Sequence, residues 1–435
     1  MMRMFLMVMC WWVGHAAAAQ DARLELLFLG DIMQHDSQIA AAYRKETNEY
    51  DYRDCFRWIA PHLRAADLTI GNLELTLAGP PYKGYPQFSA PDALVRDLKN
   101  AGVDVLVTAN NHSMDRGKAG VVRTIEVLAQ EQLLATGTFK DSTARAGQYP
   151  LVIEKNGFRI SLLNYTYGTN GIAVTPPVIV NLIDTVQIKA DLQAAQSQKP
   201  DVTIVFFHWG GEYQSQANAW QRRLTELCFR EGAQLIIGAH PHVLQPMEWH
   251  PEKNRLVAYS LGNFVSGQRP RYRDGGATLR VVLRKAVTDS VATTTIEQAR
   301  YHLQWVHRDA RQHYFVLPAA DFATDTVLLA TPVARQALQQ FLKDSRDLLS
   351  LSKSNYAVTE DSAAAYRVWI SNDATLQPAA LLDFYQAQRA DVFGAPGWVT
   401  GEFLDPETAL RAAHDISQQT PYKHAAVQRL YRKPD

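Results

Sequence analysis

Residues 235–243 read LIIGAHPHV, an apolar run followed at once by Gly238-Ala239-His240-Pro241-His242. Proline favours an extended backbone at the residue before it, and residues i and i+2 of an extended chain point the same way. The side chains of His240 and His242 are therefore expected to face one point. An apolar strand that leads directly into paired polar side chains is typical of α/β proteins, which bind ligands at the carboxyl ends of parallel strands.

The same arrangement recurs along the chain. Apolar runs also lead into GD at 30–31, GNLE at 71–74, ANNHSMDRG at 109–117, HWGGE at 208–212 and SLGNF at 260–264. Strand-type runs lie at 24–29, 68–71, 103–109, 152–154, 159–164, 202–208, 235–238, 256–260 and 278–283, and helical patterns at 52–64, 91–101, 121–132, 186–198 and 217–231. This alternation predicts an α/β fold with largely parallel sheets, whose shared carboxyl edge brings the polar clusters together.

The converging side chains form a mixed set of nitrogen and oxygen donors. Such a set suits zinc, manganese or iron better than calcium. It is too large for one tetrahedral site and matches a two-metal site, in which a carboxylate can bridge the ions and a bound water becomes the nucleophile. Taken singly, each residue has an ordinary alternative as a cap, a turn former or a core histidine. The set is Asp31, Glu74, Asn111, His112, His208, His240 and His242.

Taken in order, the polar clusters resemble the motifs of the CapA family, which are capsule and poly-γ-glutamate synthesis proteins with a calcineurin-like metallophosphatase fold. The resemblance implies a four-layer α-β-β-α sandwich over about residues 24–285. By motif, it implies metal-ligand roles for Asp31, Glu74 (as the bridging carboxylate), Asn111, His208, His240 and His242, and a catalytic role for His112 at the leaving group or phosphate. His208 and His240 would serve one ion and His242 the other.

The sequence departs from the broader metallophosphatase pattern at three places. Met33 stands where those enzymes carry the histidine of Asp-x-His, Glu74 stands in place of an aspartate, and no glycine precedes Asn111. One metal subsite is therefore expected to be poor in ligands. His35 is a candidate replacement, and an ordinary loop histidine is the alternative.

A basic loop follows the SLGNF cluster and leaves the same sheet edge. Arg269, Arg271 and Arg273, with Asn263 before them, are candidate substrate-binding residues, because guanidinium groups clamp phosphates and carboxylates. The alternative is a solvated loop whose arginines pair with Asp274 and other acids.

The N-terminus predicts export. Met1–Gln20 has one arginine, an apolar run and a small-residue end, the order of a cleaved signal peptide, although a buried helix is the alternative. The expected location is extracytoplasmic, either periplasmic or secreted. A disulfide between Cys55 and Cys228 and two buried free thiols then both remain open.

The chain of 435 residues divides into several parts. We assign 1–20 to the signal peptide, 21–285 to the metallophosphatase-like domain, 286–319 to a linker with an extra strand, and 320–435 to a mainly helical C-terminal extension. Within the last part, 333–351 and 408–417 are the clearest amphipathic stretches, and the region would be a lid or a partner-binding module.

Two functions fit these observations. The first is a metal-dependent hydrolase that acts on a phosphoester or on an amide of an anionic polymer, with one or two divalent ions of manganese, zinc or iron. The second is a non-catalytic accessory protein that binds or helps to export the polymer and keeps a partial metal site. In either case the membrane-bound capsule synthesis machinery is a further expected partner. Equal numbers of acidic and basic residues, 44 each, speak against nucleic acid.

Overall fold

We describe the fold from a computed structural model. The structure describes residues 22–288, 291–350, 358–361, 365–371, 388–392, 395–399, 412 and 425–430.

The first sheet contains β1 Ala22–Ile32, β4 Leu68–Leu73, β5 Val105–Val107, β6 Leu134–Thr136, β15 Asn263–Val265, β16 Gly275–Thr288, β17 Val291–Arg308, β18 Tyr314–Pro318 and β19 Thr359–Glu360. Its order is β18-β17-β16-β1-β4-β5-β6, with β15 beside β1 and β19 beside β17. Strands β15, β1, β4, β5 and β6 are parallel, so their carboxyl ends meet at one edge.

The second sheet contains β8 Leu151–Lys155, β9 Phe158–Thr166, β11 Val202–His208, β12 Leu235–Ala239, β13 Met247–His250 and β14 Arg255–Ala258. Its order is β13-β14-β12-β11-β9-β8, and the four inner strands are parallel. Strands buried on both faces read as continuous apolar runs, which is why β11 and β12 were predictable from sequence.

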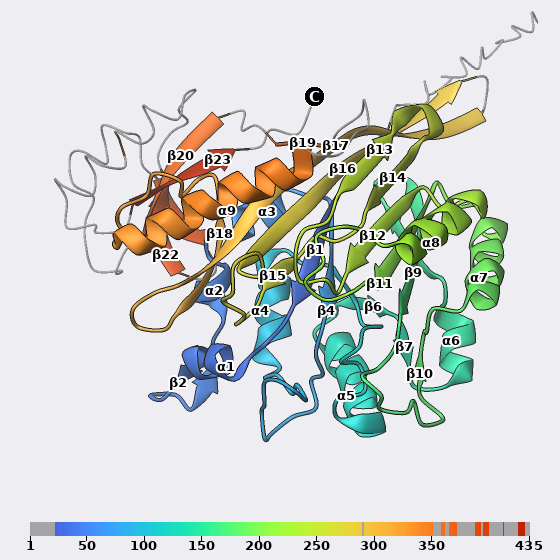
Figure 1. The fold of residues 1–435 in the computed structure, drawn as a ribbon, viewed down its shortest axis with the longest axis horizontal. Helices are drawn as coiled ribbons and strands as arrows, with labels where there is room; N and C mark the ends of the chain where they lie inside the picture. Colours follow the sequence, from blue (N-terminus) through green and yellow to red (C-terminus); the bar gives the residue numbers. More distant parts are fainter. Residues whose placement is uncertain are drawn as a thin grey trace, which may run out of the picture.

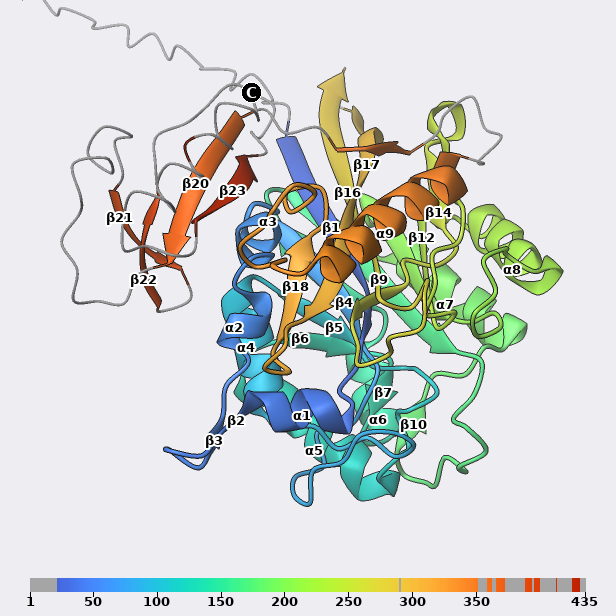
Figure 2. The same ribbon diagram turned by 60° about the vertical axis from the view of Figure 1, so that its left-hand side comes forward.

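The two sheets pack face to face around a shared apolar core, which includes Phe28 and Ile70 from the first sheet and Ile204 and Phe206 from the second. Helices α2 Arg53–Phe56, α3 Ala60–Arg64, α4 Ala93–Ala101 and α5 Gly117–Gln130 cover the outer face of the first sheet, and α7 Thr185–Ser197 and α8 Ala219–Arg230 cover that of the second. Figures 1 and 2 show the resulting layers. The predicted four-layer α-β-β-α sandwich is confirmed.

Short elements complete this part of the chain. They are α1 Asp36–Ala42, α6 Ser142–Gln148, the 3₁₀ turn η1 Pro251–Lys253, and the small strands β2 Tyr43–Arg44, β3 Glu49–Tyr50, β7 Thr138–Phe139 and β10 Ile179–Val180. Cys55 is buried in the outer layer that contains α2 and Cys228 in the one that contains α8, and both thiols are free. Of the two alternatives for this pair, the structure therefore has the buried free thiols.

A long hairpin replaces the linker that we expected after residue 285. β16 continues to Thr288 and pairs along its whole length with β17, so the boundary at 285 falls inside a strand. The stretch VATTTI at 291–296 lacks clear alternation but is rich in β-branched side chains, which favour strands. The extra strand that we expected within 286–319 is present as β17, between β16 and β18.

The described residues of the C-terminal part depart from our mainly helical expectation, because strands follow one long helix. The amphipathic stretch at 333–351 forms α9, Pro332–Ser350, which packs on β17. Beyond it the described residues form β19 and a separate sheet, ordered β21-β22-β20-β23, with β20 Ala365–Ser371, β21 Gln388–Val392, β22 Ala395–Val399 and β23 Ala425–Leu430.

Two predicted segments fall outside the described residues. They are the helix at 408–417, of which only Ala412 is described, and the signal peptide at 1–20. Within the described ranges, no helix combines the length and apolar character that a membrane span requires.

Candidate metal centre

The carboxyl edges of both sheets meet at one cluster of polar side chains. Asp31 lies near the end of β1, opposite Asn72 of β4 on one side and Asn263 of β15 on the other. His208 ends β11, in register with Ala239 of β12. The structure brings together all seven of the side chains predicted to converge, and each of them is buried.

Asp31 and Glu74 are the acidic centre of this cluster. One Asp31 oxygen, Oδ2, lies 3.1 Å from His242 Nδ1, and the backbone N–H of His240 is directed at both oxygens, at 3.2 and 3.3 Å. Glu74 Oε1 lies 3.5 Å from His208 Nε2 and 3.7 Å from His242 Nε2. His208 Nε2 also lies 2.9 Å from Asn111 Oδ1.

Glu74 is fully buried, and neither of its carboxylate oxygens has a hydrogen-bond partner. Burial, followed by repulsion from Asp31, raises the pKa of Glu74 well above its usual range. His240 Nδ1 is likewise buried without a partner. Burial lowers the pKa of His240 to about 3 and, with repulsion from His240 and His242, lowers the pKa of His208 well below its usual range.

A buried, unpartnered carboxylate is costly unless a cation compensates it. Two groups of donor atoms lie close enough to hold a metal ion: Asp31, Glu74 and His208, and Glu74, His240 and His242. Both groups contain Glu74, so a carboxylate shared between two ions fits this geometry. The imidazoles and the two carboxylates are donors that suit a divalent transition metal.

The HPH turn differs from our extended-chain expectation. His240 has φ of 97° and His242 has φ of 57°, so both lie in the left-handed region. The two imidazole rings still converge, with centroids 5.9 Å apart. Such conformations are costly for residues other than glycine and concentrate at functional sites, where the surrounding structure holds them.

His112 lies beside the donor groups and belongs to neither. Its Nδ1 lies 2.7 Å from Asp115 Oδ2, which also accepts the backbone N–H of Phe88 at 2.7 Å. The Phe88 ring meets the His112 ring edge-on. Asp115 thereby fixes the orientation of the imidazole and directs Nε2 away from itself, as expected of an oriented proton donor.

Several neighbours were missed by the sequence reasoning. Asn72 donates to Asp31 Oδ1 at 2.8 Å and lies 3.2 Å from His208 Nδ1, and the Tyr167 ring lies 4.6 Å from the His240 ring. Asn72 could have been found, because it precedes Glu74 by two residues at the end of an apolar strand. Asp115 lies within the predicted polar cluster at 109–117 but was not singled out there, and Tyr167 carries no comparable signal.

His35 does not join the donor groups identified among the described residues. It occupies the N-cap position of α1, where its Nδ1 lies 3.3 Å from Gln38 Oε1 and accepts the N–H of Gly267 at 3.2 Å. Burial lowers the pKa of His35 to about 4. Its hydrogen bonds agree with the alternative of a structural histidine.

The three arginines of the basic loop have different surroundings. Arg269 donates to the carbonyl oxygens of Gln268 and Val306, and Arg271 pairs with Asp274 and Asp344. Only Arg273 lies beside the donor cluster: its guanidinium is 3.3 Å from the centre of the Tyr213 ring, which is 6.0 Å from the His242 ring.

Asn263 also adjoins the cluster. Its Oδ1 lies 3.1 Å from His242 Nδ1, and its Nδ2 donates to the carbonyl oxygen of Arg273 at 2.8 Å. Asn263 therefore links the basic loop to the donor cluster. We infer that Asn263 chiefly orients His242 and anchors the basic loop.

Comparison with known proteins places the chain in a family. The family model described as "Bacterial capsule synthesis protein PGA_cap" matches residues 25–268, more than half of the chain. The chain belongs to this family. The PGA_cap match contains every donor of the cluster, from Asp31 to His242.

Two relatives support the same assignment. The chain is 31% identical over 265 residues to the capsule biosynthesis protein CapA of Bacillus anthracis, a match that covers 57% of this chain and 61% of that protein. It is 30% identical over 301 residues to the PGA biosynthesis protein CapA of Bacillus subtilis strain 168, covering 66% and 76%. The chain thus spans less than two thirds of the first relative.

Solved structures with some likeness include a phosphoesterase and a phosphatase. The calcineurin-like phosphoesterase YfkN of Bacillus subtilis matches at 12% identity over 75% of this chain and 99% of that chain, with a TM-score of 0.44. A novel phosphatase of Mycoplasma pneumoniae matches at 18% identity over 67% and 97%, with a TM-score of 0.39. Because both TM-scores are below 0.5, we draw no conclusion about the site from these two similarities.

Proposed function

We propose that this PGA_cap protein is an exported, metal-dependent hydrolase that acts on a phosphoester or an amide of an anionic polymer during capsule biosynthesis. The observation that carries the proposal is the buried carboxylate of Glu74, whose oxygens have no hydrogen-bond partner and which is shared by two groups of metal donors. A bound divalent metal would polarise the scissile group and lower the pKa of water. Export rests on the leader-like pattern of residues 1–20.

The chain's own residues would bind the ions, donate a proton and hold the substrate. Asp31, Glu74, Asn111, His208, His240 and His242 would hold the ions. His112, oriented by Asp115, would donate a proton to the leaving group. Arg273 would hold an anionic group of the substrate, because its guanidinium lies near the cluster and forms no ion pair within the described part of the chain.

The second candidate is an accessory protein that binds the polymer without cleaving it. Met33 favours this alternative, because it removes a histidine ligand that related metallophosphatases carry, and His35 does not replace that ligand. Both candidate functions require binding of the polymer, and they differ only in whether the protein cleaves it.

The test is hydrolysis of bis(4-nitrophenyl) phosphate and of poly-γ-glutamate, with added Mn²⁺ or Zn²⁺ and with EDTA. The hydrolase predicts turnover of at least one substrate that EDTA abolishes and that His112→Gln lowers about 100-fold or more. Wild-type protein that carries metal and binds poly-γ-glutamate without turnover would establish the accessory function instead. Glu126→Gln, on an exposed surface pair with Lys140, is the matched control.

A further inference from the structure

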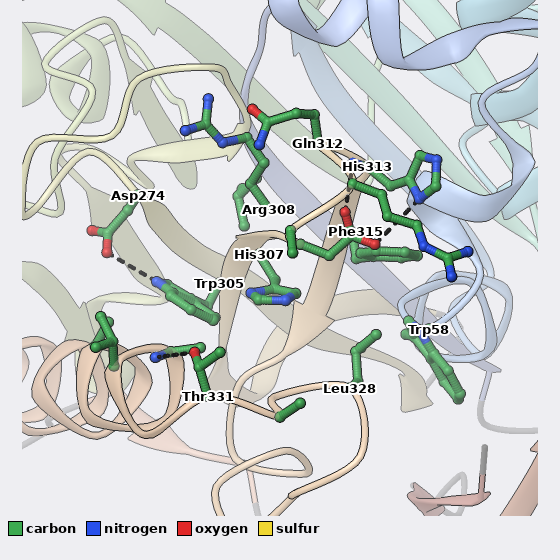
Figure 3. A pocket seen from close by; sticks show the side chains of 18 of the residues that line it. Trp58, Asp274, Trp305, His307, Arg308, Gln312, His313, Phe315, Leu328 and Thr331 are labelled. Atoms are coloured by element: carbon green, nitrogen blue, oxygen red, sulfur yellow. Dashed lines mark hydrogen bonds and ion pairs between the residues drawn. The ribbon is translucent and has the colours of Figure 1, made fainter. Parts of the chain in front are cut away.

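A cavity lies away from the donor cluster, between the β17–β18 hairpin and the start of α9. Its volume is about 910 Å³, and Figure 3 shows the side chains around it. None of the metal-donor residues lines it. The basic loop runs between the cavity and the donor cluster. Arg269 lines the cavity, whereas Arg273 stacks on Tyr213, whose ring is next to that of His242.

One wall of the cavity consists of aromatic rings. Trp305 and His307 are two residues apart on β17 and therefore lie on the same face of the sheet, and Phe315 of β18 is paired directly with His307. The ring centroids of Trp305 and His307 are 5.5 Å apart, and those of His307 and Phe315 are 6.3 Å apart, so the three rings form a row (Figure 3). Apolar side chains of the segment before α9 and of its first turns, including Leu328, complete this lining. The cavity therefore suits a ligand with an apolar body.

The charged lining of the cavity is predominantly positive, with four arginines and two aspartates. Both aspartates are already engaged. Asp274 accepts from Trp305 Nε1 at 2.9 Å and from Arg271, and Asp309 accepts from the backbone N–H of His313 and lies 3.2 Å from its Nδ1. Asp274 still opposes part of the charge of Arg269, and Arg57 pairs with Asp54, but the arginines of the lining outnumber its aspartates.

Arg269 is the most enclosed of these cations. Its Nε and Nη1 donate to backbone carbonyls, and its buried Nη2 has no hydrogen-bond partner. Burial lowers the pKa of Arg269, the charge of Asp274 opposes this shift, and the charge of Arg308 acts with burial. Arg308 and Arg311 are exposed at the rim and form no ion pair with any residue that the structure describes. An anion would supply the acceptor that Arg269 Nη2 lacks and the counter-charge that Arg308 lacks.

We propose that this cavity binds an organic anion that joins a carboxylate to an apolar ring, with the carboxylate on Arg269 and Arg308 and the ring against Trp305, His307 and Phe315. The inference goes beyond the proposed hydrolase and does not depend on it. A metal-free protein retains every residue that the cavity uses, so the two proposals fail separately.

The test is calorimetric titration of the full chain in EDTA with indole-3-acetate, with its neutral analogue tryptophol, and with acetate. We expect indole-3-acetate to bind at least tenfold more tightly than either of the other two. Arg269→Gln should weaken its binding about tenfold or more, because a hydrogen bond to a charged group is lost. Arg273→Gln, in the same loop but beside the donor cluster, should leave the affinity unchanged.

Three results would overturn the proposal. They are equal binding of tryptophol and indole-3-acetate, equal binding of acetate and indole-3-acetate, or full affinity in Arg269→Gln. If Arg269→Gln fails to fold, as judged by its near-ultraviolet circular dichroism, Arg308→Gln replaces it, because Arg308 is exposed and contributes no core packing. Unchanged affinity in that variant would contradict the proposal in the same way.

Discussion

At the scale of single residues, Glu74 determines the electrostatics of the centre. Its folded-state pKa is raised by burial and by Asp31. A carboxyl group with a raised folded-state pKa destabilises the fold once the pH exceeds the pKa of an ordinary glutamate, about 4.3. The metal-free protein should therefore lose stability as pH rises from about 5 towards neutrality.

Glu74→Gln removes this charge while keeping the shape of the side chain. In the metal-free state at pH 7.5, the variant should have a higher melting temperature than wild type, and the difference should vanish near pH 4. Because both donor groups contain Glu74, the variant should also lose the stabilisation that Mn²⁺ gives to wild type. Differential scanning fluorimetry with and without Mn²⁺ measures both effects, and a wild-type response to Mn²⁺ in the variant would refute the shared role.

Asp115 is a positioning residue for His112. Asp115→Asn should keep the metal affinity, because Asp115 belongs to neither donor group, yet lower kcat about tenfold or more. The KM of the variant should stay near the wild-type value, because Asp115 orients His112 and is not assigned to hold the substrate. Reduced stability with an unchanged kcat would indicate a merely structural residue.

At the scale of elements, the candidate site was more predictable than the backbone that carries it. The strand ends at Asp31 and His208 follow from apolar runs, because strands covered on both faces have no polar alternation. The left-handed turn at His240 and His242 had no such signal, since the surrounding tertiary contacts impose it. The pair between Arg271 and Asp344 spans 73 positions, which no local pattern reveals.

Helix α9 packs on the core through several buried side chains, among them Phe341, which is 1% exposed and faces Gly275 of β16. Phe341→Ala should lower the free energy of unfolding by about 3–4 kcal/mol, because it leaves a cavity in the core. Val333→Ala, in the first turn of the same helix at a position that is 76% exposed, should change it by less than about 0.5 kcal/mol. Urea denaturation compares the two, and equal effects would contradict this account of α9.

At the scale of the whole molecule, α9 belongs to the body of the protein. Leu338, Phe341 and Leu342 lie in the same apolar cluster as the residues between the two sheets. The pattern at 333–351 predicted the helix, but amphipathicity alone could not tell a lid from a core helix.

This assignment predicts how the chain tolerates truncation. A chain that ends at Pro318 should aggregate, because it exposes the apolar face of β16 and β17 that α9 covers. A chain that ends at Asp361 should remain soluble and bind Mn²⁺. Size-exclusion chromatography distinguishes the two, and a monodisperse, cooperatively folded 1–318 chain would show that α9 is an independent appendage.

The central claim is that Glu74 joins two groups of metal donors in one centre. The most direct measurement is the metal content of the purified chain after loading with Mn²⁺ or Zn²⁺ and removal of free ions, determined by inductively coupled plasma mass spectrometry. The account predicts one to two ions per chain in wild type, and less than half of the wild-type content in Glu74→Gln and in His240→Ala. Wild type without bound metal, or variants that retain the full wild-type content, would contradict it.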